Sequence, residues 1–254
     1  MYLPKKNYFL LNLEIRNRLG DLASVSQILS EAKIEILNGS FNRGFGGKPG
    51  TWQIFVEPQN SNTTSEEMKR LLLSCPDVIS CQIKESRDGL LVDTLTFPVK
   101  LSSGQRAMIM RNDIWNGMLQ KTRDTFSSGA DVIIYDQGMM AGKMTGRELL
   151  YALGKDKAAE HIDQIVSMYQ GLGWGKAKLM SFIRSPLSLV IRMFESAECM
   201  GQKSSRPTGH FIRGHILGVA EEISGTEGKC TETNCLSLGN PYCEFVLEEK
   251  KRTK

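Results

Sequence analysis

Three of the six cysteines in this chain of 254 residues lie close together, at Cys230, Cys235 and Cys243. Thiolates are strong, soft metal ligands, and a turn between two strands can bring separate thiolates to one point. Residues 238–241 (Leu-Gly-Asn-Pro) predict such a turn, because residues with high strand propensity flank them. The spacing differs from the paired C-x2-C of common zinc fingers. It therefore leaves two interpretations open, a metal site and small buried apolar side chains.

The histidines give no sign of catalysis. Only His161, His210 and His215 are present, and none lies in a recognised catalytic motif. His210 and His215 are five residues apart, which on a helix is not one face, so they do not form a metal-binding pair. The G-x-S-x-G, H-E-x-x-H, Walker and dinucleotide-binding fingerprints are all missing from the sequence. The sequence favours a non-enzymatic function and keeps an enzyme as the alternative.

The second half of the chain predicts the elements that must position the cysteines. Helices are expected over residues 111–126, 156–170 and 208–224, and residues 129–135 should lead into a further helix in which Gly138 and Gly142 permit close backbone approach. A hairpin is expected from strands 176–185 and 187–194, followed after the last helix by the strands that carry the cysteines. Helices and antiparallel strands come in separate runs, which predicts an α+β domain.

The cysteine-rich stretch also carries a family resemblance. The run Glu232-x2-Cys235-x3-Gly239-x3-Cys243-Glu-Phe resembles the C-terminal signature of the 4-vinyl-reductase domain, a family of small-molecule-binding domains. The resemblance extends from about residue 100 to 248. It implies an α+β fold similar to subunits of the TRAPP vesicle-tethering complex. The family also includes sensory domains of transcription activators that respond to aromatic hydrocarbons.

In those aromatic sensors, a zinc ion is held by a glutamate, the cysteine three residues later, a cysteine eight further on, and one upstream cysteine. The first three positions match Glu232, Cys235 and Cys243, whereas the upstream position falls on Gly209. The resemblance therefore implies zinc as the cofactor and a fourth ligand from elsewhere. The residues able to supply it are, in order of preference, Cys230, Cys199 and His210.

The resemblance further implies an apolar ligand, hydrocarbon or aromatic, between the helices and the sheet near the zinc hairpin. The residues expected to contact it are Trp115, Tyr135, Phe194, Phe211 and His215. Ten of the twelve methionines also lie in this half, where their adaptable side chains line pockets or fill core. The expected function is a ligand-binding sensor or regulatory protein. The alternatives are an enzyme or accessory factor of tetrapyrrole biosynthesis, after the reductase step that names the family, and a structural assembly module.

The first 86 residues predict a separate, ferredoxin-like domain. Strands are expected at residues 8–15, 34–37, 51–56 and 78–83, with helices beginning at Asp21 and at Ser65, the latter capped by Thr64. The order βαββαβ is that of a split βαβ unit.

The turn between the first strand and helix resembles an ACT domain, a module that usually regulates by binding amino acids between copies. The resemblance lies in residues 18–25 (Arg-Leu-Gly-Asp-Leu-Ala-Ser-Val). Backbone N–H groups at a helix N-terminus suit a carboxylate, which predicts an amino-acid-like effector at Asn17, Leu19, Gly20 and Asp21. In the alternative interpretation Gly20 only makes the turn and the domain only dimerises. A homodimer is expected in either case.

Composition sets the remaining expectations. A net charge of +4, 41% hydrophobic and 24% charged residues describe an ordinary globular protein, with no nucleic-acid-binding motif. No apolar run of about 18 residues and no signal-peptide pattern is seen, so the protein is expected in the cytoplasm, where its cysteines stay reduced. The expected division is an ACT-like domain at 1–86, a linker at 87–99, the 4-vinyl-reductase domain at 100–248 and a basic tail at 249–254.

Overall fold

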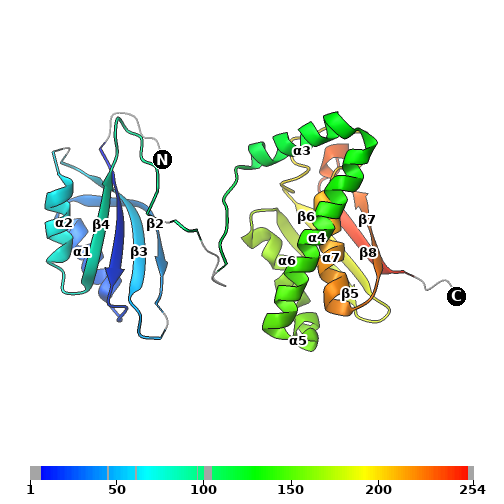
Figure 1. Ribbon diagram of the computed structural model, residues 1–254, viewed down its shortest axis with the longest axis horizontal. Coiled ribbons are helices and arrows are strands. Elements are labelled where there is room, and N and C mark those ends of the chain that lie inside the picture. Colours follow the sequence, from blue (N-terminus) through cyan, green and yellow to red (C-terminus); the bar gives the residue numbers. More distant parts are fainter. Residues whose placement is uncertain (1–6, 45, 61, 96, 100–104, 251–254) are drawn as a thin grey trace. The chain divides into compact units, whose positions relative to one another are not determined.

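The computed structural model describes residues 7–44, 46–60, 62–95, 97–99 and 105–250, and divides the chain into two compact units, Met1–Met108 and Ile109–Lys254 (Figure 1). Residues 87–99, expected to be a linker, group with the first unit, because Leu91 packs against Tyr8 and Leu10 on the sheet. Residues 251–254 of the expected basic tail lie outside the described residues. Among the residues described, none of the helices is both long and apolar enough to span a membrane.

The first unit has the predicted ferredoxin-like order. Its elements are β1 (Phe9–Ile15), α1 (Asp21–Glu31), β2 (Ile34–Asn42), β3 (Gly50–Pro58), α2 (Ser65–Leu73) and β4 (Val78–Glu85). The sheet order is β2-β3-β1-β4, and every neighbouring pair is antiparallel. The two helices cover one face of this sheet (Figure 1).

Alternation along β1 explains the core of the first unit. Phe9, Leu11, Leu13 and Ile15 point to the helix-covered face, as period-two alternation requires. The start of α2 is fixed locally, because Thr64 and Glu67 form a reciprocal capping box. The N–H of Glu67 donates to Thr64 Oγ1 at 3.2 Å, and the N–H of Thr64 donates to Glu67 Oε2 at 3.0 Å.

The second unit is α+β, as predicted, with one antiparallel sheet of order β5-β6-β8-β7. Its elements are α3 (Asn112–Phe126), α4 (Ser128–Leu153), α5 (Lys155–Glu160), α6 (Ile162–Gly171), β5 (Lys176–Ile183), β6 (Ser188–Phe194), α7 (His210–Ser224), β7 (Gly228–Asn234), the 3-10 turn η1 (Leu236–Leu238) and β8 (Cys243–Glu249). Residues 129–135 lie inside α4 rather than before it. The helix expected at 156–170 is broken at His161, whose φ of −104° and ψ of 30° are not helical.

Glycines bring α4 and α7 into backbone contact. A Cβ added at Gly138 or Gly142 would collide with the carbonyl oxygens of Phe211 and His215, respectively. Gly214 of α7 meets the carbonyl of Tyr135 in the same way. The predicted close approach at Gly138 and Gly142 is therefore confirmed, and it holds the helix that begins beside the cysteines against the longest helix of the unit (Figure 1).

Candidate metal centre and ligand cavity

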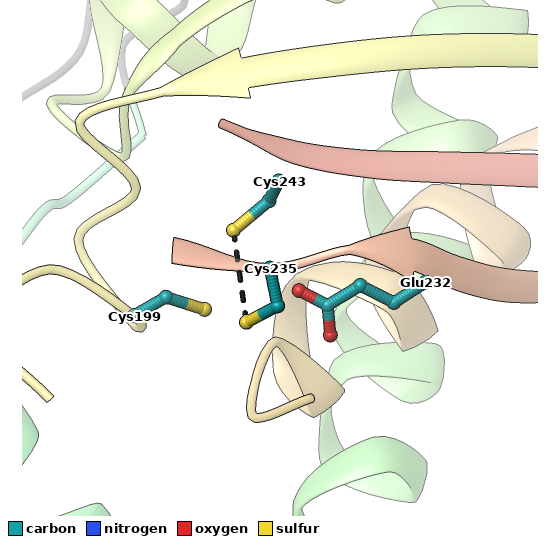
Figure 2. Close-up of side chains that lie close together, drawn as sticks. All are labelled: Cys199, Glu232, Cys235 and Cys243. Atoms are coloured by element: carbon teal, nitrogen blue, oxygen red, sulfur yellow. Dashed lines mark hydrogen bonds between the residues drawn. The ribbon is translucent and has the colours of Figure 1, made fainter. Parts of the chain in front are cut away.

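Four buried side chains converge at the end of the second sheet (Figure 2). The donor atoms of Cys199, Glu232, Cys235 and Cys243 all lie within 4.8 Å of one another. They come from the turn after β6, from β7, from the loop after β7 and from the first residue of β8. Only tertiary folding brings Cys199 to the other three, since 33 residues separate it from Glu232.

A β-bulge aims Glu232 and Cys235 at the same point. Residues three apart in a regular strand face opposite sides of the sheet. Here Glu232 pairs with Phe245 but Asn234 pairs with Glu244, so Thr233 is an extra residue in β7. The bulge turns the following Cys235 back to the face of Glu232, across from Cys243.

Tight turns hold the cysteines from the backbone. The N–H groups of Cys199 and Met200 donate to the carbonyl of Ser196, at 3.1 and 2.8 Å. Beyond β7, the N–H of Cys235 donates to Asn240 Oδ1 at 3.1 Å, which closes the loop predicted at residues 238–241. These bonds fix both thiol-bearing turns without using the sulfur atoms.

The electrostatics of the group are those of crowded acids. Burial, reinforced by the charge of Cys235, raises the pKa of Glu232 to about 9. Hydrogen bonds from the thiols of Cys199 and Cys243 hold the pKa of Cys235 well below its usual range, and the Cys235 thiolate in turn raises the pKa of Cys199. The protein alone thus supports one thiolate here. A divalent cation would compensate the charge of the other three donors.

The donor geometry fits a metal ion. Glu232 Oε2 accepts the N–H of Gly209 at 2.9 Å, whereas its buried Oε1 has no hydrogen-bond partner among the described residues. Cys235 Sγ and Cys243 Sγ are 4.0 Å apart. Thiolates about 2.3 Å from a tetrahedral zinc lie roughly 3.8 Å from each other. Three thiolates and one carboxylate oxygen would complete such a site and leave no open position.

Neighbouring polar groups support the sulfur atoms. The hydroxyl of Ser237 lies 3.0 Å from Cys235 Sγ, and the N–H of Leu236 donates to Cys243 Sγ at 3.4 Å. Donors around metal-bound thiolates orient them and disperse their charge. The surroundings of the group therefore match those of a closed, structural metal site.

Cys230, which the sequence placed first as the fourth ligand, lies outside the group. It sits five residues before Cys235 on the extended β7, about 16 Å away at 3.3 Å per residue, and it packs in the apolar core. His210 is also outside, since its Nε2 lies 3.1 Å from Asp131 Oδ1 and its Nδ1 lies 3.3 Å from Arg213 Nη2. The group contains Cys199, the second of the three residues in the predicted order.

Gly209 explains the substitution of ligands. A Cβ at this position would lie 2.8 Å from Glu232 Oε1, so a side chain here would point into the group. Without one, the space belongs to the carboxylate of Glu232, and Cys199 supplies the third thiol from the opposite direction.

Glu198, the neighbour of Cys199, links the group to the start of α7. Its buried carboxylate accepts the N–H groups of Phe211 and Ile212, both at 3.0 Å, and lies 3.5 Å from Arg123 Nη2 of α3. Burial raises the pKa of Glu198 to about 7, despite these donors. The carboxylate caps the positive end of the helix dipole, a role that sequence reasoning missed, since local cap signals come from neighbouring residues.

The predicted ligand-contacting residues fall in different places. Trp115, Phe211 and His215 belong to one aromatic cluster, in which Trp174 also lies 5.5 Å from Phe211 and 4.9 Å from His215 between ring centroids. Tyr135 stacks under Arg213, and Phe194 packs against Tyr242 outside the cluster. The rings of the cluster fill each other's space.

The centre of the aromatic cluster is a buried polar pair. Tyr169 Oη lies 2.9 Å from His215 Nδ1, and Thr145 Oγ1 lies 3.3 Å from His215 Nε2. Burial lowers the pKa of His215 to about 4, so the ring is neutral at physiological pH. Sequence reasoning gave little weight to Trp174 and none to Tyr169 at this cluster. The available signal was a tryptophan enclosed by glycines at residues 171–175.

A cavity of about 320 Å³ lies at the other end of α7. The side chains that line it are mostly apolar, with two cations and several hydroxyls: Lys155, Ala159, Ile162, Phe182, Arg184, Ser185, Leu187, Leu189, Ala220, Ile223, Ser224 and Thr226. None of the five aromatic residues expected to contact a ligand is among them. Helical spacing identified Ile162 as inward-facing, but sequence could not show that the space beside it is unfilled.

The effector residues predicted in the first unit form a folded turn. Gly20, with φ of 96°, precedes α1, and the N–H of Arg18 donates to the buried Asp21 carboxylate at 2.7 Å. Asn17 donates to the carbonyl of Gly44 at 2.8 Å, and Leu19 is fully exposed. Asp21 thus occupies a donor that a carboxylate ligand would otherwise use.

Comparisons with known proteins agree with this architecture. The family model of the 4-vinyl-reductase domain matches residues 189–249, which contain all four residues of the candidate metal centre. The second unit contains a 4-vinyl-reductase domain. Two uncharacterized proteins of Methanocaldococcus jannaschii, MJ0855 and MJ1642, are each 26% identical to this chain. The matches cover 50% of this chain and 58% of MJ0855, and 41% of this chain and 66% of MJ1642, less than two thirds of either relative.

Two solved structures are similar to the second unit. The phenol-responsive sensory domain of the transcription activator PoxR, solved with phenol, has a TM-score of 0.50 over 59% of this chain and 80% of that domain, at 13% identity. A vinyl-4-reductase family protein from Methanocaldococcus jannaschii has a TM-score of 0.33 over 58% of this chain and all of that chain, at 16% identity. At such identities the PoxR likeness establishes the fold of the second unit and no more.

Proposed function

We propose that this chain is a ligand-responsive regulatory protein whose second unit binds an apolar small molecule in the 320 Å³ cavity beside α7. The cavity is the observation that carries the proposal. Small-molecule sites occupy about 300–1,000 Å³ and combine apolar walls with a few polar groups. An apolar cavity of about 150 Å³ is enough for benzene.

The lining specifies the kind of ligand. Phe182, Leu189 and Ile223 offer apolar contact, whereas Lys155 and Arg184 place positive charge at the same cavity. An aromatic or aliphatic molecule with one polar or anionic end matches this combination. That the PoxR domain, which shares the fold, was solved with phenol supports an aromatic ligand.

Zinc bound by Cys199, Glu232, Cys235 and Cys243 has a structural role in this proposal. The ion would hold the β7–β8 hairpin and the turn that carries Glu198, the cap of α7. Ala220 and Ile223, near the end of the same helix, form part of the cavity wall. Metal binding therefore stabilises the helix on which the cavity depends.

The metal assignment is tested by elemental analysis of the purified, reduced protein. We expect about one zinc per chain, lost in Cys235→Ser and Cys243→Ser and retained in Cys81→Ser, which alters a buried cysteine of the first unit. Wild-type protein prepared without chelators and lacking metal would refute the assignment and leave the thiols as core residues.

The ligand assignment is tested by calorimetry and thermal shift with phenol, benzoate, toluene and octanoate. Ala220→Trp fills the cavity and should abolish binding, whereas Ala152→Trp, at an exposed position of α4, is the matched control. Binding by the wild type that survives Ala220→Trp but is lost in His215→Phe would move the site to the aromatic cluster. No binding of any of the four compounds by the wild type would count against the sensor function.

The first unit is proposed as an ACT-like regulatory module for an amino-acid-like effector near Asn17, Leu19, Gly20 and Asp21. The cations Arg16, Arg43 and Lys48 line a hollow beside Asn17, which supports a carboxylate ligand. Titration with the twenty amino acids, repeated on Arg16→Ala, tests this assignment. Unchanged melting with all of them would leave dimerisation or packing as the function of the turn.

A further inference from the structure

The outer face of α4 carries a straight line of exposed apolar side chains. Ile133, Met140, Met144 and Tyr151 are 38%, 61%, 63% and 96% exposed. At 100° per residue, all four lie within about 20° of one line parallel to the helix axis. We refer to these four residues as the α4 stripe.

The stripe has no core to join within the second unit. The opposite face of α4 consists of Gly138, Gly142 and Gly146, which pack on α7. Large apolar residues on the solvent side of such a helix gain nothing from the core beneath. Contiguous exposed apolar surface of this kind is typical of a docking site.

From the spacing we infer that the occupant of the α4 stripe is the same helix of a second copy of this chain, in antiparallel orientation. The intervals between the four residues are seven, four and seven, so the line reads the same in both directions about Gly142. An antiparallel copy places Ile133 opposite Tyr151 and Met140 opposite Met144. A two-fold interface requires such a self-complementary surface.

The charged residues beside the stripe obey the same symmetry. Asp136 and Arg147 lie on one flank of the line, at nearly equal distances from Gly142, and Gln137 and Glu148 lie on the other. In the antiparallel pair, Asp136 of each copy meets Arg147 of the other, and Gln137 meets Glu148. The guanidinium of Arg147, 65% exposed, keeps donors free beyond its 3.1 Å contact with Glu222. An unrelated partner would have no reason to match both flanks.

Sedimentation velocity on the full chain tests the inference. The double variant Met140→Glu/Met144→Glu should raise the dimer dissociation constant at least about tenfold, because it buries four like charges at the interface. Met180→Glu, at a methionine of β5 that is 47% exposed, is the control and should leave self-association unchanged.

A charge exchange distinguishes pairing between copies from any effect within one chain. Asp136→Arg alone and Arg147→Asp alone should each weaken the dimer, and the combination of both should restore it. Residues eleven apart on one helix are roughly 16 Å apart, so this rescue cannot arise within one α4.

Three results would overturn the inference. The wild-type protein could sediment as a monomer at high concentration, or the stripe variants could leave a dimer intact, which would place the interface elsewhere. The variants could also lower the melting temperature of a monomer, which would show that the first unit of the same chain covers the stripe.

Discussion

The two units of this protein both bury cysteines, and these differ in what surrounds them. Cys75 and Cys81 lie in the apolar core of the first unit among aliphatic side chains. Burial raises the pKa of Cys81 to about 11, so it stays a neutral thiol. Cys199, Cys235 and Cys243 are equally buried, yet they face one another and the carboxylate of Glu232.

The difference shows that burial and residue type do not define a metal site. Two thiols in an aliphatic core act as small apolar residues. Three thiols around a carboxylate oxygen without a hydrogen-bond partner among the described residues form a donor set that needs compensating charge. The contrast predicts that equal substitutions will have unequal consequences in the two units.

The largest difference is expected between Cys235→Ser and Cys81→Ala. Cys235→Ser removes one ligand and leaves the other three buried without compensation, which should lower the unfolding free energy of the second unit by about 3–5 kcal/mol. Cys81→Ala loses only packing, about 1 kcal/mol. Chemical denaturation, with zinc content measured alongside, checks the pair. Equal losses in both variants would remove the distinction between the two cysteine environments.

Acid should affect the second unit more strongly than the first. All three histidines lie in the second unit, and burial lowers the pKa of His215 and of His210 to about 4. The unfolded chain binds these protons near pH 6.5, so the stability they protect is present above pH 6.5 and is lost as the pH falls toward 4.

For His215 the loss between pH 7 and pH 5 should be about 2 kcal/mol. Urea denaturation at both pH values checks it, with His215→Gln as the variant in which the loss shrinks. A wild-type stability that stays flat across this interval would mean that the ring is solvated in the native state.

A smaller effect is expected at the cap of α7. Glu198→Gln keeps the shape of the side chain but removes the charge shared with Arg123 and with two backbone donors, which should cost about 2 kcal/mol. Zinc affinity should fall as well, since Cys199 is the adjacent residue. Denaturation combined with metal competition measures both, and Glu195→Gln, at an exposed glutamate, is the matched control.

The smallest effect is expected at the cap of α2. Thr64→Ala removes the capping box in the first unit and should lower its stability by about 1 kcal/mol without changing zinc content. Hydrogen exchange at the first turn of α2 localises the loss. A loss larger than that of Glu198→Gln would reverse the ranking of local and tertiary caps.

The outcome of sequence reasoning follows the same division between local and distant interactions. The βαββαβ order, the capping box at Thr64, the final helix and the cysteine hairpin were predicted from patterns within a few residues of each other. Glu232, Cys235 and Cys243 came from the resemblance of one short stretch. The break of the helix at His161 was not predicted, because the apolar spacing continues across it.

The sequence by itself determined the periodic elements, the α+β class and the three donors on the hairpin, because each depends on contacts between near neighbours in the chain. Only the tertiary structure decided that Cys199 rather than Cys230 completes the group, that Glu198 caps α7, and that a cavity lies beside Ala220. These features join segments far apart in sequence. Chain geometry excludes Cys230 through the extension of β7, and the unfilled volume exists only once all its walls have packed.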